Sequence, residues 1–355
     1  MTRIPRLATA SAAAVVVALA VSACGTTDTE QAQEQEPSAA PVSQECAEDT
    51  TATSTGPVSM TDGLGRTVEL ERPAERVAVL EWQQIEDALS LCVAPVAVSD
   101  VEGYTTYVTA EDLPEGTTDV GLRQEPDLDT LYASDPDLII VEAVSADDEV
   151  LAQLEERDVP VLATVGADPE DPIGNMKDVF SMIAEATGRE ERGDQVLQDF
   201  DQHLADAKQQ VEGTDMATDE FVYFDGWVDA GNLTIRPYGE GALFTALGEE
   251  LGMRTAWTED IEASYGDGGV VPAYGLSSTD LEGLTAVGDA NLFYANDEAA
   301  EGGYVEALES NPLWTSMPAV QEGRAHAFPP SIWGAGGPKS NEQAIDAYVE
   351  ILTQD

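Results

Sequence analysis

Residues 119–142 read DVGLRQEPDLDTLYASDPDLIIVE, and this stretch decides the fold class. Its first four residues (119–122) predict a short strand, and Arg123 falls in the turn that follows. A helix is predicted to begin near Pro126 and to end at the SDPD segment, and the apolar run 138–141 predicts a buried strand. An arginine at a strand-to-helix turn is either placed where α/β sheets bind ligands or is a solvated side chain of an ordinary α/β unit. The stretch alone leaves both interpretations open.

The same alternation extends to both sides of this stretch. The segment 58–71 predicts a small hairpin, and the apolar runs 76–80 and 95–100 predict buried strands. Between those two strands lies a helical pattern with Ile85 and Leu89 on one face. Helix and strand alternate once more before residue 165, which indicates a largely parallel sheet covered by helices.

A second alternation follows the longest helical pattern of the chain, which spans 173–211 and is interrupted at Gly188. It starts with a strand at 221–229 and closes with a helix at 338–352. We therefore predict an α/β protein with two Rossmann-like lobes and mostly parallel central sheets, joined by one long rigid helix. The predicted divisions are a signal peptide (1–23), a flexible tether (24–57), an N-terminal lobe (58–172), a helical connector (173–212) and a C-terminal lobe (213–355).

The charge balance of the 355 residues is extreme, with 15 Lys and Arg against 69 Asp and Glu and a formal net charge of −54. Nucleic acid is excluded as a partner, because phosphate binding needs a basic surface. Strongly anionic ligands are disfavoured for the same reason. A solvated acidic surface of this kind suits a protein that works outside the cell or in a saline habitat.

The N-terminus has the features of a bacterial lipoprotein signal. Arg3 and Arg6 precede a short apolar core, and small residues lead into Cys24, which we expect to be acylated and to anchor the chain to the membrane. The remaining cysteines, Cys46 and Cys92, then form an even pair in an oxidising compartment. A disulfide between them is one hypothesis, and two unpaired thiols are the other.

A catalytic set is not visible in the sequence. GxSxG, HExxH and CxxC motifs are absent, and the two histidines, His203 and His326, fall in separate predicted elements. The GGPKS segment (336–340) differs from a phosphate-binding loop, because Pro338 removes a backbone donor. Paired carboxylates are frequent, but the abundance of acidic residues explains them. We therefore expect neither an enzyme nor a direct metal site.

Aromatic residues and two arginines gather near predicted loops and element ends. Arg123 and Arg236 occupy comparable positions in the two lobes, and the aromatic residues are Trp82, Tyr104, Tyr107, Trp227, Tyr265, Tyr274 and Trp333. Such side chains suit a small ligand bound in a cleft between lobes. Packing in the core or between the lobes is the alternative for each aromatic residue.

From about residue 58 to the C-terminus, the chain resembles the iron-siderophore substrate-binding proteins of ABC importers, the family that includes the ferrichrome-binding protein. The resemblance rests on several segments in the family's order: RVAVLEWQQIEDALSLCVAPVAVSD, DVGLRQEPDLDTLYASDPDLII, GALFTALGEELGMRTAW and NPLWTSMPAVQEGRAHAFPPSIWGAGGP, together with the lipoprotein signal. It implies a class III periplasmic-binding-protein fold, with the lobes joined by a long helix at 190–211. The implied function is an extracytoplasmic, lipid-anchored and monomeric protein that delivers a ferric siderophore to the permease subunits of an ABC transporter.

The resemblance also implies the ligand contacts. Arg123 matches the arginine that reaches the iron-chelating oxygens, and Trp333 matches an aromatic wall of the cleft. The further candidates are Trp82, Tyr104, Arg236 and Tyr265. Because the cleft candidates include only two arginines, a neutral or cationic tris-hydroxamate suits them better than an anionic catecholate. A cobalamin or haem binder of the same fold and, at greater distance, a secreted enzyme remain alternatives.

Docking on the permease is the last role that the resemblance implies. The family uses one exposed acidic residue on each lobe, and these positions fall at Asp129 and Glu249. The first position is usually Glu in the family. Asp129 departs from this pattern, and its shorter side chain reaches less far toward the permease.

Overall fold

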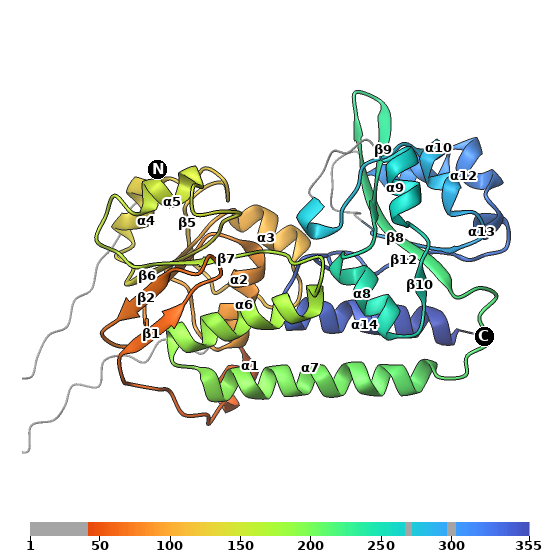
Figure 1. Cartoon of the computed structure of the whole chain (residues 1–355). Coiled ribbons are helices and arrows are strands. Elements are labelled where there is room, and N and C mark those ends of the chain that lie inside the picture. Colours follow the sequence, from red (N-terminus) through yellow and green to blue (C-terminus); the bar gives the residue numbers. More distant parts are fainter. Residues whose placement is uncertain (1–41, 267–271, 297–302, 355) are drawn as a thin grey trace, which may run out of the picture. The chain divides into compact units, whose positions relative to one another are not determined.

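The computed structural model describes residues 42–266, 272–296 and 303–354 (Figure 1). The predicted signal peptide, Cys24 and the first part of the predicted tether lie outside these residues. The described chain forms two α/β lobes, as the sequence predicts. Within the same residues, no helix combines the length and the apolar character that crossing a membrane requires.

The first lobe is built on a five-stranded parallel sheet in the order β5-β4-β3-β6-β7. Side chains of β3 alternate between two cores: Val77 and Val79 belong to one, and Ala78 to the other. A sheet covered on both faces needs apolar side chains on both, which is why its strands are continuous apolar runs. The strands are β3 (Val77–Val79), β4 (Ala97–Val98), β5 (Thr118–Asp119), β6 (Leu138–Glu142) and β7 (Val161–Thr164).

Helices cover both faces of this sheet. One face packs against α2 (Trp82–Ser90), α3 (Val101–Tyr107) and the hairpin of β1 (Val58–Thr61) and β2 (Thr67–Leu70). The other face packs against α4 (Leu128–Ala133) and α5 (Glu149–Leu154). Because the strands are parallel, the residues that follow them gather at one edge of the sheet, where α/β proteins bind ligands.

The second lobe has a parallel sheet in the order β10-β8-β11-β12, and β9 pairs with β8 in an antiparallel hairpin. The tip of this hairpin projects beyond the helices of the lobe in Figure 1. The strands are β8 (Glu220–Asp229), β9 (Asn232–Tyr238), β10 (Arg254–Thr255), β11 (Asn291–Tyr294) and β12 (Ala325–Ala327).

Two helical layers enclose the second sheet. One contains α8 (Leu243–Glu250) and α14 (Pro338–Thr353), and its core includes Phe221, Phe293 and Tyr348. The other layer is made of short helices: α9 (Glu259–Tyr265), α10 (Leu281–Leu284), α11 (Tyr304–Glu309), α12 (Pro312–Ser316) and α13 (Pro318–Gln321). The 3-10 turns η1 (Pro272–Tyr274) and η2 (Thr285–Val287) lie between α9 and β11 in the chain.

Two helices connect the lobes. α6 (Pro172–Thr187) ends at Gly188, whose φ of 69° is easily adopted only by glycine. α7 (Glu190–Val211) has the predicted bounds, and its side chains contribute to both lobes. Val196 lies in the core of the first lobe, whereas Phe200 lies in the core of the second. A single helix thus takes part in both cores, as expected of a rigid connector.

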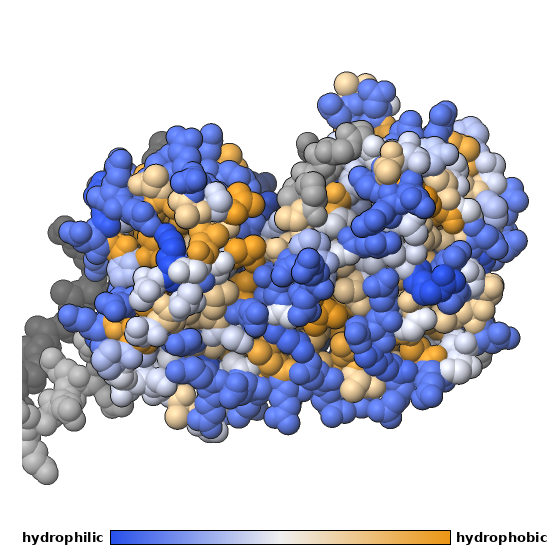
Figure 2. Space-filling model, in the orientation of Figure 1, coloured by the Kyte–Doolittle hydropathy of each residue, from blue (hydrophilic) through white to orange (hydrophobic). Residues whose placement is uncertain are grey.

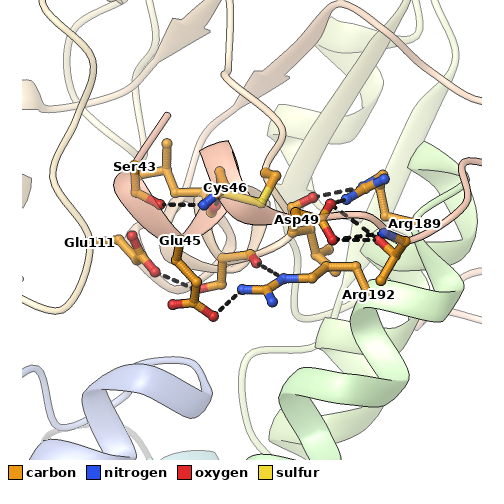
Figure 3. The surroundings of a disulfide bond; sticks show 12 residues. Ser43, Glu45, Cys46, Asp49, Glu111, Arg189 and Arg192 are labelled. Carbon is orange, nitrogen blue, oxygen red and sulfur yellow. Dashed lines mark hydrogen bonds and ion pairs between the residues drawn. A yellow bond between two sulfur atoms is a disulfide. The ribbon is translucent and has the colours of Figure 1, made fainter. Parts of the chain in front are cut away.

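A disulfide joins Cys46 and Cys92 and fixes the segment around α1 (Gln44–Glu48) to the C-terminal end of α2 (Figure 3). The backbone N–H of Ser54 also donates to the carbonyl of Gly188 at 2.8 Å. Residues 43–54 are therefore attached to the first lobe and the connector. These residues belong to the predicted tether (24–57), and in the structure the disulfide and this hydrogen bond hold them against the first lobe and the connector.

Two buried arginines at the start of α7 support the same attachment (Figure 3). Arg189 forms an ion pair with Asp49, and Arg192 forms one with Glu45. Their Nε atoms donate to the carbonyl oxygens of Leu91 at 2.9 Å and Ser90 at 3.1 Å, where α2 ends. Cations at a helix C-terminus satisfy carbonyls that have no partner within the helix.

Candidate functional site

A cavity of about 290 Å³ lies between the two lobes, and its walls come from both. The first lobe contributes residues that follow β3, β5, β6 and β7, at the edge of the sheet where a ligand is expected. Hydrophilic residues cover most of the face drawn in Figure 2, in agreement with the acidic composition. The residues of the cavity that bear polar or aromatic groups include Glu81, Gln83, Arg123, Gln124, Glu142, Arg236, Tyr238, Tyr274 and Trp333.

Arg123 is held in the cavity wall by a carboxylate and by two aromatic rings. Its Nη1 donates to Glu81 Oε1 at 2.5 Å. Its guanidinium carbon lies 3.9 Å from the centroid of the Trp82 ring and 5.8 Å from that of Trp333. Glu81 Oε1 also accepts from the backbone N–H of Trp82 at 2.8 Å, so Glu81 caps α2 while it binds the arginine. These contacts fix the direction of the guanidinium before a ligand arrives.

Trp333 and Trp82 form an aromatic corner beside this arginine. Their ring centroids are 4.7 Å apart in an edge-to-face arrangement, and Tyr107 stacks on Trp82 at 5.7 Å. Trp333 lines the cavity, whereas Trp82 is buried behind Arg123 and does not line it. Trp82 therefore positions the predicted ligand contacts and is not itself one of the cavity-lining residues.

Arg236 reaches the same cavity from β9 of the second lobe. Its Nε donates to Asp225 Oδ1 at 2.7 Å, and its Nη2 is bonded to the other carboxylate oxygen. Tyr238 Oη donates to the same carboxylate at 3.1 Å. Burial lowers the pKa of the Arg236 guanidinium, but Asp225, together with Tyr238 and Tyr223, raises this pKa by more than burial lowers it. The second arginine of the site is thus also paired with a carboxylate of the protein.

Glu142 and Tyr274 meet across the lobes. Tyr274 Oη, from η1, donates to Glu142 Oε1, at the end of β6, with a distance of 2.5 Å. Burial and the charge of Glu81 raise the pKa of Glu142 to about 7, although the hydrogen bond from Tyr274 and the charge of Arg123 lower it. Gly166 lies against this pair, because a Cβ built on it would overlap with Tyr274 Oη and Glu142 Oε2.

Two predicted ligand contacts lie elsewhere. Tyr104 is a core residue with 1% exposure, and its hydroxyl donates to the carbonyl of Glu111 at 2.8 Å. The expectation that it lines the cleft does not hold for this cavity, because its ring is enclosed by the first lobe. Tyr265 is 52% exposed at the end of α9 and is not among the lining residues.

An open groove of about 540 Å³ adjoins the cavity on the first lobe. Glu81, Arg123 and Glu142 line both spaces, together with Gln124 and Val144. The charged residues that the groove adds are all acidic: Glu125, Asp148 and Glu149. In the described ranges, no group of three or more His, Cys, Asp or Glu side chains is arranged to hold a metal ion.

Sequence reasoning missed Glu81 and Glu142, the two carboxylates of the cavity. Glu142 is the last residue of β6 and Glu81 comes two residues after β3, and these two apolar strands are paired side by side. The signal was present in the sequence, since an acidic residue at the end of a buried parallel strand lies at the ligand-binding edge. The large number of acidic residues concealed it.

Comparisons with known proteins agree with this architecture. The model of the family described as "Periplasmic binding protein" matches residues 77–331. The iron(3+)-hydroxamate-binding protein FhuD of Escherichia coli (strain K12) is 24% identical over 263 residues, which cover 74% of this chain and 81% of FhuD. The probable siderophore-binding lipoprotein YfiY of Bacillus subtilis (strain 168) is 25% identical over 311 residues, which cover 86% and 90% of the two chains.

A solved structure shows the same fold. The triscatecholate siderophore binding protein FeuA from Bacillus subtilis, complexed with ferri-bacillibactin, superposes with a TM-score of 0.64 at 20% identity. The superposition covers 84% of this chain and 98% of the FeuA chain.

Proposed function

The chain belongs to the periplasmic binding protein family, and from this premise we propose that it captures a ferric siderophore outside the cytoplasm and delivers it to the permease of an ABC importer. It acts as a binding protein and not as an enzyme. The observation that carries the proposal is the cavity between the lobes, in which Arg123, Arg236 and Trp333 come together. A ligand in this cavity contacts both lobes at once.

The chemistry of the cavity suits an iron chelate. The guanidinium groups of Arg123 and Arg236 donate hydrogen bonds to the partly negative oxygens that surround Fe(III) in a chelate. Trp333 offers an apolar face to the organic backbone of the ligand. The iron belongs to the ligand, so the protein needs no metal-coordinating side chain of its own.

Within the family, we propose a tris-hydroxamate as the ligand. The fold alone does not choose, because FhuD is named for hydroxamates and FeuA for triscatecholates. The charges of the cavity support the choice: Arg123 is paired with Glu81, and Arg236 is paired with Asp225. A tris-catecholate complex with several negative charges would meet carboxylates and no unpaired arginine among these residues, and burying unpaired charge is costly.

Quenching of tryptophan fluorescence tests the ligand class, because two tryptophan rings lie at or behind the cavity wall. We expect ferrioxamine B or ferrichrome to quench at submicromolar concentration and a ferric tris-catecholate to bind at least 100-fold more weakly. Arg123→Ala is expected to lower hydroxamate affinity at least tenfold. Arg254→Ala serves as the matched control, since Arg254 pairs with Asp219 and is not among the cavity residues. Tight binding of the catecholate alone would overturn the choice of ligand.

We also propose that acylation of Cys24 anchors the protein to the extracytoplasmic face of the membrane. The support is the lipoprotein signal in the sequence. Cells grown with a labelled fatty acid test it, and we expect label on the wild-type chain and none on Cys24→Ala. An unlabelled wild-type chain, or label that survives the substitution, contradicts the anchor.

Docking on the permease is proposed to use Asp129 on α4 and Glu249 on α8, both of which are exposed. Reversal of both charges to Lys is expected to abolish iron uptake while siderophore affinity stays within twofold of wild type. The control reverses two exposed acidic residues of α7, Asp194 and Asp199. Undiminished uptake by the Asp129 and Glu249 variant, or equal loss in the control, refutes the docking role.

A further inference from the structure

Glu142 is a carboxyl group of the cavity that forms no ion pair with any Lys, Arg or His among the described residues. Among the described residues, Arg123 pairs with Glu81 and Asp100, and Arg236 pairs with Asp225. The hydrogen-bond partner of Glu142 is the neutral hydroxyl of Tyr274. A mostly buried carboxylate with no cation partner is unfavourable, so an ordinary structural role does not explain an acid at this position.

The position of Glu142 places it where a ligand extends out of the cavity. It lines both the cavity and the adjoining open groove. The groove adds three acidic side chains and no basic one. Consider a ligand whose chelated iron lies between Arg123 and Arg236. If it has an arm that extends along the first lobe, this arm passes Glu142 and enters the negatively charged groove.

We propose that Glu142 is a specificity-determining residue that receives a cationic group of the ligand, such as the ammonium of a linear ferric hydroxamate with a free amine. The inference rests on the proposed function and narrows its ligand class from ferric hydroxamates to those that carry positive charge. Tyr274 Oη donates a hydrogen bond to Glu142 Oε1, so Oε2 is the oxygen that accepts a hydrogen bond from the ammonium. Gly166 packs against this pair, and a side chain there would collide with Tyr274 Oη and Glu142 Oε2. The same carboxylate and the acidic groove disfavour ligands with an anionic arm.

The pKa of Glu142 agrees with this role. Burial and Glu81 raise it to about 7, so the carboxyl is partly protonated near neutral pH in the absence of a ligand. A cation placed next to Oε2 favours the ionised form, and binding then releases a proton. The titratable and charged groups that face Glu142 are Glu81, Arg123 and Tyr274.

A series of ligands on one scaffold tests the inference. Ferric complexes of desferrioxamine B, its N-acetyl derivative and its N-succinyl derivative share one chelating core and carry an ammonium, a neutral amide and a carboxylate on the same arm. We expect the wild-type chain at low salt and pH 8 to bind the ammonium form about tenfold more tightly than the neutral form. The carboxylate form is expected to bind about tenfold more weakly than the neutral form.

Substitution separates Glu142 from the general acidity of the surface. In Glu142→Gln, the preference for the ammonium form over the neutral form is expected to fall below twofold. Glu282→Gln, at an exposed site of α10, is the control and keeps the preference. The ligand series on the wild-type chain decides the charge preference even if Glu142→Gln folds poorly.

The outcomes distinguish the two levels of the proposal. Equal affinities of the wild-type chain for the three complexes overturn the charge preference but leave the proposed function standing. A preference that persists in Glu142→Gln overturns the role of Glu142. Binding of none of the three overturns the choice of a hydroxamate and this inference together.

Discussion

Substitution of Glu86 by Gln at the contact between α2 and α14 is expected to remove a pH dependence of stability. Glu86 is fully buried, and its Oε1 accepts from the backbone N–H of Ser340 at 2.8 Å, near the start of α14. The Ser340 hydroxyl donates to Oε2. Burial raises the pKa of Glu86 to about 7 from 4.5, although the bonds from Ser340 lower it. The adjacent Asp87 is also buried, and its pKa is raised as well.

The direction of the effect follows from the two pKa values of Glu86. Between pH 4.5 and 7, the folded chain holds a proton that the unfolded chain releases, so stability falls as the pH rises through this range. A shift of this size corresponds to about 3 kcal/mol, at 1.36 kcal/mol for each pKa unit. Gln resembles the protonated carboxyl and can still accept the Ser340 N–H. The Glu86→Gln variant therefore does not show the part of the stability loss that comes from the ionisation of Glu86.

Urea unfolding of both chains at pH 5, 6, 7 and 8 measures the effect. The difference in unfolding free energy, Glu86→Gln minus wild type, is expected to rise by about 2.5 kcal/mol between pH 5 and pH 8, because part of the full shift lies below pH 5. Taking this difference cancels the contribution of Glu142, which both chains share. The contribution of Asp87 is coupled to Glu86, because the charge of Glu86 adds to the effect of burial in raising the pKa of Asp87. Glu282→Gln is the exposed control, with no expected change. Equal loss of stability in wild type and Glu86→Gln over this range would refute the reasoning.

Three further predictions concern the disulfide and the cavity. Replacing Cys46 and Cys92 by Ser is expected to lower the unfolding free energy by about 4 kcal/mol, from a loop with a sequence separation of 46; urea unfolding that is unchanged from wild type contradicts this. Gly166→Ala is expected to weaken siderophore binding at least tenfold in fluorescence titrations, because its Cβ displaces Tyr274 from Glu142; wild-type affinity would argue against that contact. Affinity for an ammonium-bearing hydroxamate is expected to increase severalfold from pH 6 to pH 8, as Glu142 with its pKa of about 7 ionises, while affinity for the N-acetylated form stays constant; parallel pH profiles of the two ligands contradict it.

Local sequence patterns were sufficient to predict most of the fold. The apolar runs of β3 and β6 and the stripe of α7 predict these elements directly, because a covered parallel sheet and a packed helix need those periodicities. The attachment of residues 43–54 was only partly foreseen. The disulfide was one of two hypotheses, but the ion pairs of Arg189 and Arg192 depend on where α7 begins relative to α2, which no local pattern specifies.

The candidate site was also predicted only in part, because local sequence patterns do not specify contacts between distant elements. Arg123, Trp333 and Arg236, three of the proposed ligand contacts, line the cavity. To predict the pairing of Arg123 with Glu81, one must know which strands are neighbours. To predict the contact of Glu142 with Tyr274 of the other lobe, one must know how the two lobes are arranged. Aromatic residues at element ends were ambiguous from the start, since the same pattern fits a cleft wall and a core.

The central claim is that a ferric siderophore binds between the lobes, and anomalous scattering from iron tests it most directly. A crystal of the chain with ferrioxamine B, measured at the iron absorption edge, is expected to show one strong peak per molecule in the cavity lined by Arg123, Trp333 and Arg236. A peak at another place on the chain, or an empty cavity in a chain that binds the complex in solution, would contradict the claim.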